Sequence, residues 1–252
     1  MAASDVAIQA AGDVAAATIA AGIVAPFVAA CDKAIAEAAS GQTTVWKSTF
    51  KSLGELARSP VTFLGQPAFR ILWVMYGGTY AAANLFTSYE EISQTSKPLM
   101  KTGSIFCVNA SLSLWKDSQF AKLFSGKPPA PVPKPALVTW YARDFISMGV
   151  IFVAPPIVAR HLHESMGVEK RTADVTTQFC LPLLLQPFVA PLHLYGYVLY
   201  NDPNASVSQQ MTVMRREIAG AVQMRLARCV APYSIGTNVN KAIRKALKPT
   251  AA

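Results

Sequence analysis

The chain has 252 residues, of which 52% are hydrophobic and 15% are charged, and its mean hydropathy is +0.30. Soluble domains are usually about one-quarter charged, so this composition argues against an ordinary soluble domain and favours a membrane protein. The net charge of +9 suits anionic lipid head groups, which makes membrane lipids the expected partners. Nucleic acid is excluded as a partner, because the basic residues lie mostly between apolar runs without interleaved aromatic residues.

Residue types that carry catalysis or metal binding form no recognisable set in this sequence. His161 and His163 stand two apart without a third ligand-type side chain, and a solvated helix end explains them more simply. There is no Gly-rich phosphate loop and no nucleophile elbow. The four cysteines lie far apart inside apolar runs, where a free thiol behaves as a small hydrophobe. We therefore expect no enzyme, no catalytic residue and no metal site.

Charge-free runs mark six candidate membrane-spanning segments. In chain order they cover residues 14–31, 71–89, 102–115, 145–159, 175–201 and 229–240. A membrane span needs about 20 predominantly apolar residues, so the shorter runs reach this length only by including a charged residue. Such residues usually face a bundle interior or a watery cavity. The sequence thus predicts an all-α membrane protein with six transmembrane helices around a polar centre.

The segments between these runs differ in character. Residues 43–60 alternate apolar and charged positions at helical spacing and predict an amphipathic helix that ends before Pro60. Residues 206–229 repeat this pattern, with basic residues among Met, Ile and Val. Each amphipathic segment could lie on a membrane surface or pack on a neighbouring helix. Residues 125–136 contain five prolines and predict an extended connector.

A weak internal repeat links the second apolar run of each pair. An arginine enters each run and a glycine follows six to eight residues later; the pairs are Arg70 with Gly77, Arg143 with Gly149, and Arg228 with Gly236. This pattern predicts three tandem two-helix repeats. They cover residues 1–96, 97–168 and 169–252, and the Pro-rich connector shortens the second.

Residues 63–92, "FLGQPAFRILWVMYGGTYAAANLFTSYEEI", resemble the second helix of the mitochondrial carrier family. The similarity comprises an aromatic-x-Gly start at Phe63 and Gly65, the cavity arginine Arg70, and the aromatic–acid pair at Tyr89 and Glu90. The resemblance implies a six-helix bundle with pseudo-threefold symmetry and multi-pass insertion in the mitochondrial inner membrane. It also implies that Phe63 and Gly65 help to bind cardiolipin, with no other cofactor.

The resemblance also points to the carrier family's gate motif, Pro-x-Asp/Glu-x-x-Lys/Arg, which this chain has largely lost. One acid, Asp32, and one base, Lys116, are retained. The other gate positions hold Ser113, His193 and Gly196. The family's pairing then implies that no complete ion pair survives. For His193 a hydrogen-bonded residue at a helix end is favoured over a gate residue, and Lys116 and Asp117 are interpreted as interfacial residues.

The three repeated arginines have two interpretations. As inward-facing cations, Arg70, Arg143 and Arg228 could bind a carboxylate or phosphate of a substrate. They could equally pair with Asp144, with Glu90 or with a lipid head group.

These features support two functional hypotheses. The degenerate gate favours a carrier-like protein that has lost transport and serves as an accessory subunit of a respiratory-chain complex. The arginines and the positive net charge support the alternative, an active solute carrier that exchanges an anionic metabolite across the inner membrane.

Overall fold

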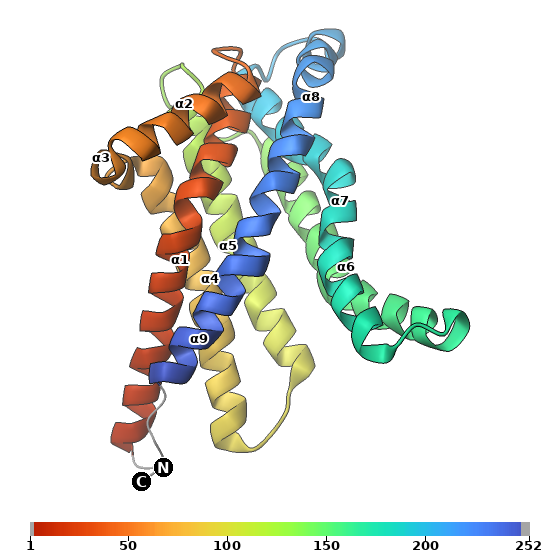
Figure 1. Cartoon of the computed structure of the whole chain (residues 1–252). Helices are drawn as coiled ribbons and strands as arrows, with labels where there is room; N and C mark the ends of the chain where they lie inside the picture. Colours follow the sequence, from red (N-terminus) through yellow and green to blue (C-terminus); the bar gives the residue numbers. More distant parts are fainter. Residues whose placement is uncertain (1–2, 248–252) are drawn as a thin grey trace. The chain divides into compact units, whose positions relative to one another are not determined.

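The computed structural model describes residues 3–247, apart from the side chains of residues 3, 152, 233 and 234, and within this range it contains helices and no strand. In chain order the elements are α1 (Ala3–Ala39), α2 (Val45–Arg58), α3 (Pro60–Leu64), α4 (Pro67–Ser93), α5 (Pro98–Phe124), α6 (Lys134–Met166), α7 (Lys170–Asn201), α8 (Val207–Val230), the π-helical turn η1 (Ala231–Gly236) and α9 (Thr237–Leu247) (Figure 1). The all-α prediction is confirmed.

Three helices within the described range are long and apolar enough to cross a membrane. They are Ser4–Ala39 of α1, Lys134–Met166 of α6 and Lys170–Asn201 of α7. Each contains one of the apolar runs found in the sequence. Three of the six predicted segments therefore lie in helices that are candidates for membrane spans.

The connecting segments follow the sequence pattern in two cases and depart from it in one. Residues 125–133 form no helix, and α2 ends at Arg58, as expected from the proline positions. The amphipathic segment 206–229, in contrast, forms α8 and continues without a loop through η1 into α9. The π-helical turn accommodates Pro232, whose carbonyl accepts hydrogen bonds from the hydroxyls of Tyr80 (3.2 Å) and Thr237 (3.0 Å).

The chain divides into two compact units, whose boundaries fall inside α1, α2, α5 and α8. Unit 1 comprises Met1–Ala30, Lys51–Lys116 and Val230–Ala252. Unit 2 comprises Cys31–Phe50 and Asp117–Cys229.

Unit 1 is built on close contacts between small residues. The part of α1 in this unit buries a series of alanines, including Ala17, Ala20 and Ala21, with no exposed surface. Small residues let helix backbones approach closely, which is the usual basis of helix association in membranes. A Cβ atom added to Gly236 would lie 2.7 Å from Val24 Cγ2, so η1 and α1 pack too closely there for a larger residue.

Unit 2 is organised around the α6–α7 hairpin, whose two helices lie side by side (Figure 1). The helices are joined by a short turn in which Gly167 takes the left-handed conformation that ends α6. Two buried aromatic rings join them near the N-terminal end of α6 and the C-terminal end of α7. The rings of Trp140 on α6 and Tyr197 on α7 pack edge-to-face with centroids 5.1 Å apart.

Candidate functional site

A fully buried carboxylate, Asp117 of α5, joins α5, α6 and α7 within unit 2. Its Oδ2 accepts a hydrogen bond of 2.6 Å from Arg143 Nη1 on α6. Its Oδ1 accepts from His193 Nε2 at 3.0 Å and from the Tyr197 hydroxyl at 2.9 Å, both on α7. Burying a charge is costly unless it is paired and hydrogen-bonded, and these three donors meet that requirement. The interpretation of Asp117 as an interfacial residue is therefore wrong.

His193 connects this carboxylate to a second cation. Its Nδ1 lies 3.0 Å from Arg225 Nη1 on α8. A guanidinium can only donate, so Nδ1 must accept and the ring proton must be on Nε2, where it is donated to Asp117. This bonding pattern assigns a neutral histidine. His193 is hydrogen-bonded as expected, but it is fully buried inside α7 rather than placed at a helix end.

Two further ion pairs complete the cluster. Arg228 Nη1 donates to both carboxylate oxygens of Asp32, at 2.6 and 2.8 Å. Arg143 also binds its neighbour Asp144, at 2.9 Å from Nε and 2.6 Å from Nη2. The loss of ion pairs between the gate positions themselves stays a prediction; the structure pairs Asp32 with Arg228, an arginine outside those positions. Sequence comparison with the carrier gate could not show this, since the partners come from other helices.

Arg225 differs from the other two arginines of the cluster. Its side chain is 3% exposed. Its Nε donates to Gln186 Oε1 at 3.0 Å, and its other partner is His193. Both partners are neutral, and among the residues that the structure describes no carboxylate forms an ion pair with Arg225.

We call this cluster the unit 2 network; it consists of Asp32, Asp117, Asp144, Arg143, Arg225, Arg228 and His193. Three carboxylates face three guanidiniums, and the histidine is neutral. The network so defined carries no net charge. It therefore combines guanidiniums, which can bind anions, with carboxylates, which can bind cations, at buried positions. Its total charge favours neither an anionic nor a cationic ligand.

The structure brings together only part of the predicted site. Arg143 and Arg228 belong to the unit 2 network and are neutralised by carboxylates, whereas Arg70 is exposed on α4 in unit 1. Arg143 pairs with Asp144, which was one of the two interpretations, and contact between these arginines and a substrate stays a prediction. Ser113 and Lys116 are buried on α5 in unit 1.

Gly196 has a steric role that the carrier gate comparison did not suggest. A Cβ atom at this position would lie 2.1 Å from Nε1 of the Trp140 indole. The same nitrogen donates to the His193 carbonyl at 3.2 Å. A side chain on residue 196 would therefore collide with the indole, which explains why glycine fits this position.

Phe63 and Gly65, the expected lipid-binding residues, lie at the C-terminal end of the short helix α3. Phe63 is 2% exposed, and Gly65 is an exposed residue that follows the helix. Their assignment to cardiolipin stays a prediction.

A second polar cluster, in unit 1, joins α1, α4 and α9. Arg244 Nε donates to Asp13 at 2.7 Å, and Arg244 Nη2 donates to Glu91 at 3.1 Å. Asn84 and Asn240 exchange two hydrogen bonds, of 2.9 and 2.8 Å, beside this pair.

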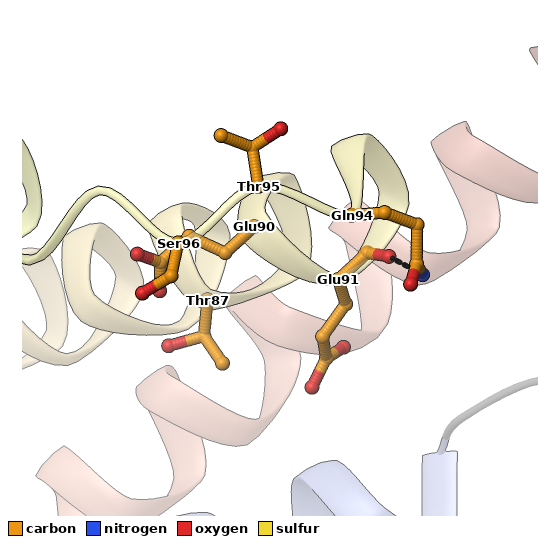
Figure 2. Close-up of a pocket in the computed structure, with 6 residues that line it drawn as sticks. All are labelled: Thr87, Glu90, Glu91, Gln94, Thr95 and Ser96. Carbon is orange, nitrogen blue, oxygen red and sulfur yellow. Dashed lines mark hydrogen bonds between the residues drawn. The ribbon is translucent and has the colours of Figure 1, made fainter.

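An open pocket of about 430 Å³ lies at the C-terminal end of α4. Figure 2 shows its lining residues, Thr87, Glu90, Glu91, Gln94, Thr95 and Ser96. Glu90 accepts from Lys101 Nζ at 2.9 Å and from the Lys97 backbone N–H at 2.8 Å, and these bonds lower the pKa of its carboxyl group. Its lining has acidic and neutral side chains but no basic one, whereas the unit 2 network has guanidiniums as well as carboxylates and is the stronger candidate site.

Comparison with known proteins places this chain in a family. A family model described as "Probable citrulline exporter" matches residues 16–248, which is nearly the whole chain. The chain belongs to this family. No curated protein and no solved structure shows a significant match.

Membership in the probable citrulline exporter family corrects two predictions. The chain is not identified as a mitochondrial carrier, and its interpretation as an accessory subunit that has lost transport is wrong, because the family is one of exporters. Placement in the mitochondrial inner membrane and binding to a respiratory-chain complex both followed from the carrier resemblance and lose their support with it. That resemblance was misleading because arginines at helix entries and glycines at close helix contacts suit many membrane helix bundles.

Proposed function

We propose that this protein is a membrane transporter that exports citrulline, or an α-amino acid with the same polar groups, in chemically unchanged form. The observation that carries the proposal is the family match over residues 16–248. The three apolar helices are consistent with insertion in a membrane. No catalytic step is needed for this function.

The charge balance of the unit 2 network supports a zwitterionic substrate. Citrulline carries one carboxylate, one ammonium group and a neutral ureido group. The network offers guanidiniums for the carboxylate and carboxylates for the ammonium group, and its own charges sum to zero. A neutral ligand leaves this balance intact, whereas an anionic metabolite would leave one uncompensated buried charge.

The same network supports a transport cycle with two conformations. Its ion pairs connect four elements of unit 2, so they must rearrange if a substrate passes between these helices. Buried ion pairs gain Coulomb energy but lose hydration, and the two contributions nearly cancel. Such a balance suits a transporter, whose conformations must lie within a few kcal/mol of each other.

We further propose that six helices cross the membrane. α4, α5 and the continuous path through α8, η1 and α9 contain the other three apolar runs, and their buried polar residues would face protein rather than lipid. The three two-helix repeats proposed from the sequence would then each contribute two crossings.

Transport can be tested with purified protein in liposomes loaded with labelled citrulline. Efflux above that of protein-free liposomes, with unmodified citrulline recovered outside, supports the proposal. A folded, correctly reconstituted protein that moves no citrulline in either direction would contradict it. Competition by amino acids and by dicarboxylates separates a zwitterion transporter from an anion transporter.

A further inference from the structure

The unit 2 network contains one guanidinium that is buried without a carboxylate partner. Arg143 and Arg228 each pair with aspartate, whereas Arg225 donates only to Gln186 and His193 within the described residues. Arg225 is nevertheless 3% exposed. A buried cation with only neutral partners has lost its hydration without gaining an ion pair, which is an unfavourable arrangement unless an anion joins it.

The two neutral partners of Arg225 are themselves held in fixed orientations. Gln186 Nε2 donates to the Pro182 carbonyl at 2.6 Å, and this bond turns the amide oxygen towards Arg225. His193 donates its Nε2 proton to Asp117, and this bond leaves Nδ1 as the acceptor for Arg225. The guanidinium is therefore oriented by two acceptors before any ligand arrives, which lowers the cost of binding.

The observed bonds of Arg225 use Nε and Nη1. Among the residues described, Nη2 donates no hydrogen bond. A planar guanidinium binds a carboxylate through parallel N–H groups, and such charge-assisted bonds are stronger than bonds between neutral groups.

We propose that Arg225 binds the α-carboxylate of the transported amino acid, with Gln186 and His193 as positioning residues. This inference rests on the proposed transport of an amino acid. Arg225 then selects substrates that bear a carboxylate.

The test measures binding of citrulline and of its amide, in which a carboxamide replaces the α-carboxylate. In the wild-type protein the amide should bind at least about tenfold more weakly, because it cannot form the charge-assisted pair. Arg225→Gln should weaken citrulline binding by a similar factor and bring the two affinities close to equality. Arg225→Lys should retain part of the preference. Arg215→Gln, which removes an exposed arginine from the same helix, is the matched control and should leave both affinities unchanged.

Gln186→Glu provides a second test that does not remove the arginine. It places a carboxylate where Oε1 now lies 3.0 Å from Arg225 Nε. This internal anion should weaken citrulline binding at least about tenfold, because Arg225 is already neutralised. The substitution also removes the Nε2 donor to the Pro182 carbonyl, so the melting temperature serves only to show that the variant is folded. A purely structural role for Arg225 predicts a folded variant without the loss of binding. Gln186→Glu decides the question if Arg225→Gln does not fold.

The outcomes separate the two proposals. If the wild-type protein transports citrulline but Arg225→Gln or Gln186→Glu keeps the wild-type preference for the carboxylate, the role of Arg225 is refuted and transport stands. If citrulline is not bound, the proposed substrate is wrong. The role of Arg225 is then judged with other amino acids and their amides, and an absence of Arg225-dependent preference across that set refutes it too.

Discussion

Trp140 occupies the space that a side chain on residue 196 would need: its indole Nε1 lies 2.1 Å from the Cβ position of Gly196. This contact brings α6 close to α7 and lets the indole donate to the His193 carbonyl. The position of His193 in the unit 2 network therefore depends on a glycine one turn further along α7.

Gly196→Ala should destabilise the protein by about 1–3 kcal/mol, because the rigid, hydrogen-bonded indole cannot move aside without cost. The measurement is the thermal or denaturant-induced unfolding of the purified protein in detergent. Gly149→Ala on α6 is the control, since nothing lies within 4 Å of the Cβ position there. The control should be neutral or up to about 1 kcal/mol more stable, because alanine favours the helix. Equal stabilities for the two variants would contradict the steric role of Gly196.

Asp117→Asn should cost about 3–5 kcal/mol, because it removes the charge that pairs with buried Arg143 and receives the His193 proton. Replacing both Asp117 and Arg143 by neutral residues should cost less than the sum of the two single substitutions, because the ion pair between them is then lost only once. A double-mutant cycle on unfolding free energies measures the coupling. Asp202→Asn, at an exposed position after α7, is the control. Additive effects of the two network substitutions would show that the pair is not coupled.

Arg244→Gln should destabilise the contacts between α1, α4 and α9 by about 1–3 kcal/mol, because Asp13 and Glu91 lose charge-assisted hydrogen bonds. Hydrogen exchange of α9 should rise in this variant, which reports local opening of that helix. Lys241→Gln changes an exposed charge on the same helix and should have little effect. Unchanged exchange in Arg244→Gln would show that the cluster does not hold α9.

The Glu90 carboxyl should make the turn between α4 and α5 sensitive to acid. Its pKa lies below the ordinary value of 4.5, first because of the hydrogen bond from Lys101 and then because of the Lys97 backbone N–H. A lowered folded-state pKa contributes stability above the unfolded-state value, and this contribution disappears as the pH falls through the folded-state value. The protection factors of residues 94–101, which compare the measured exchange rate with the intrinsic rate at each pH, should therefore decrease between about pH 5 and about pH 3 in the wild-type protein. In Glu90→Gln this dependence should be absent.

Much of the secondary structure could be predicted from the order of residues alone. Apolar runs without charges marked the long helices, prolines marked the connector at 125–133, and the spacing of charged residues marked α2. These are local properties, because helix formation and membrane insertion depend on neighbouring residues. The same local features misled the assignment to a family, since small residues and arginines at helix entries occur in many membrane proteins.

The candidate site could not be predicted in this way, because its pairs join residues that are far apart in the sequence. Asp32 and Arg228 are separated by 196 positions in the sequence. Asp117 on α5 is hydrogen-bonded to His193 on α7. The sequence determined that this protein is helical and apolar, and that its few charged residues lie beside the apolar runs. Only the tertiary structure decided which of those charges neutralise one another and that Arg225 is left with neutral partners, because the energy of a buried charge depends on what lies next to it in space.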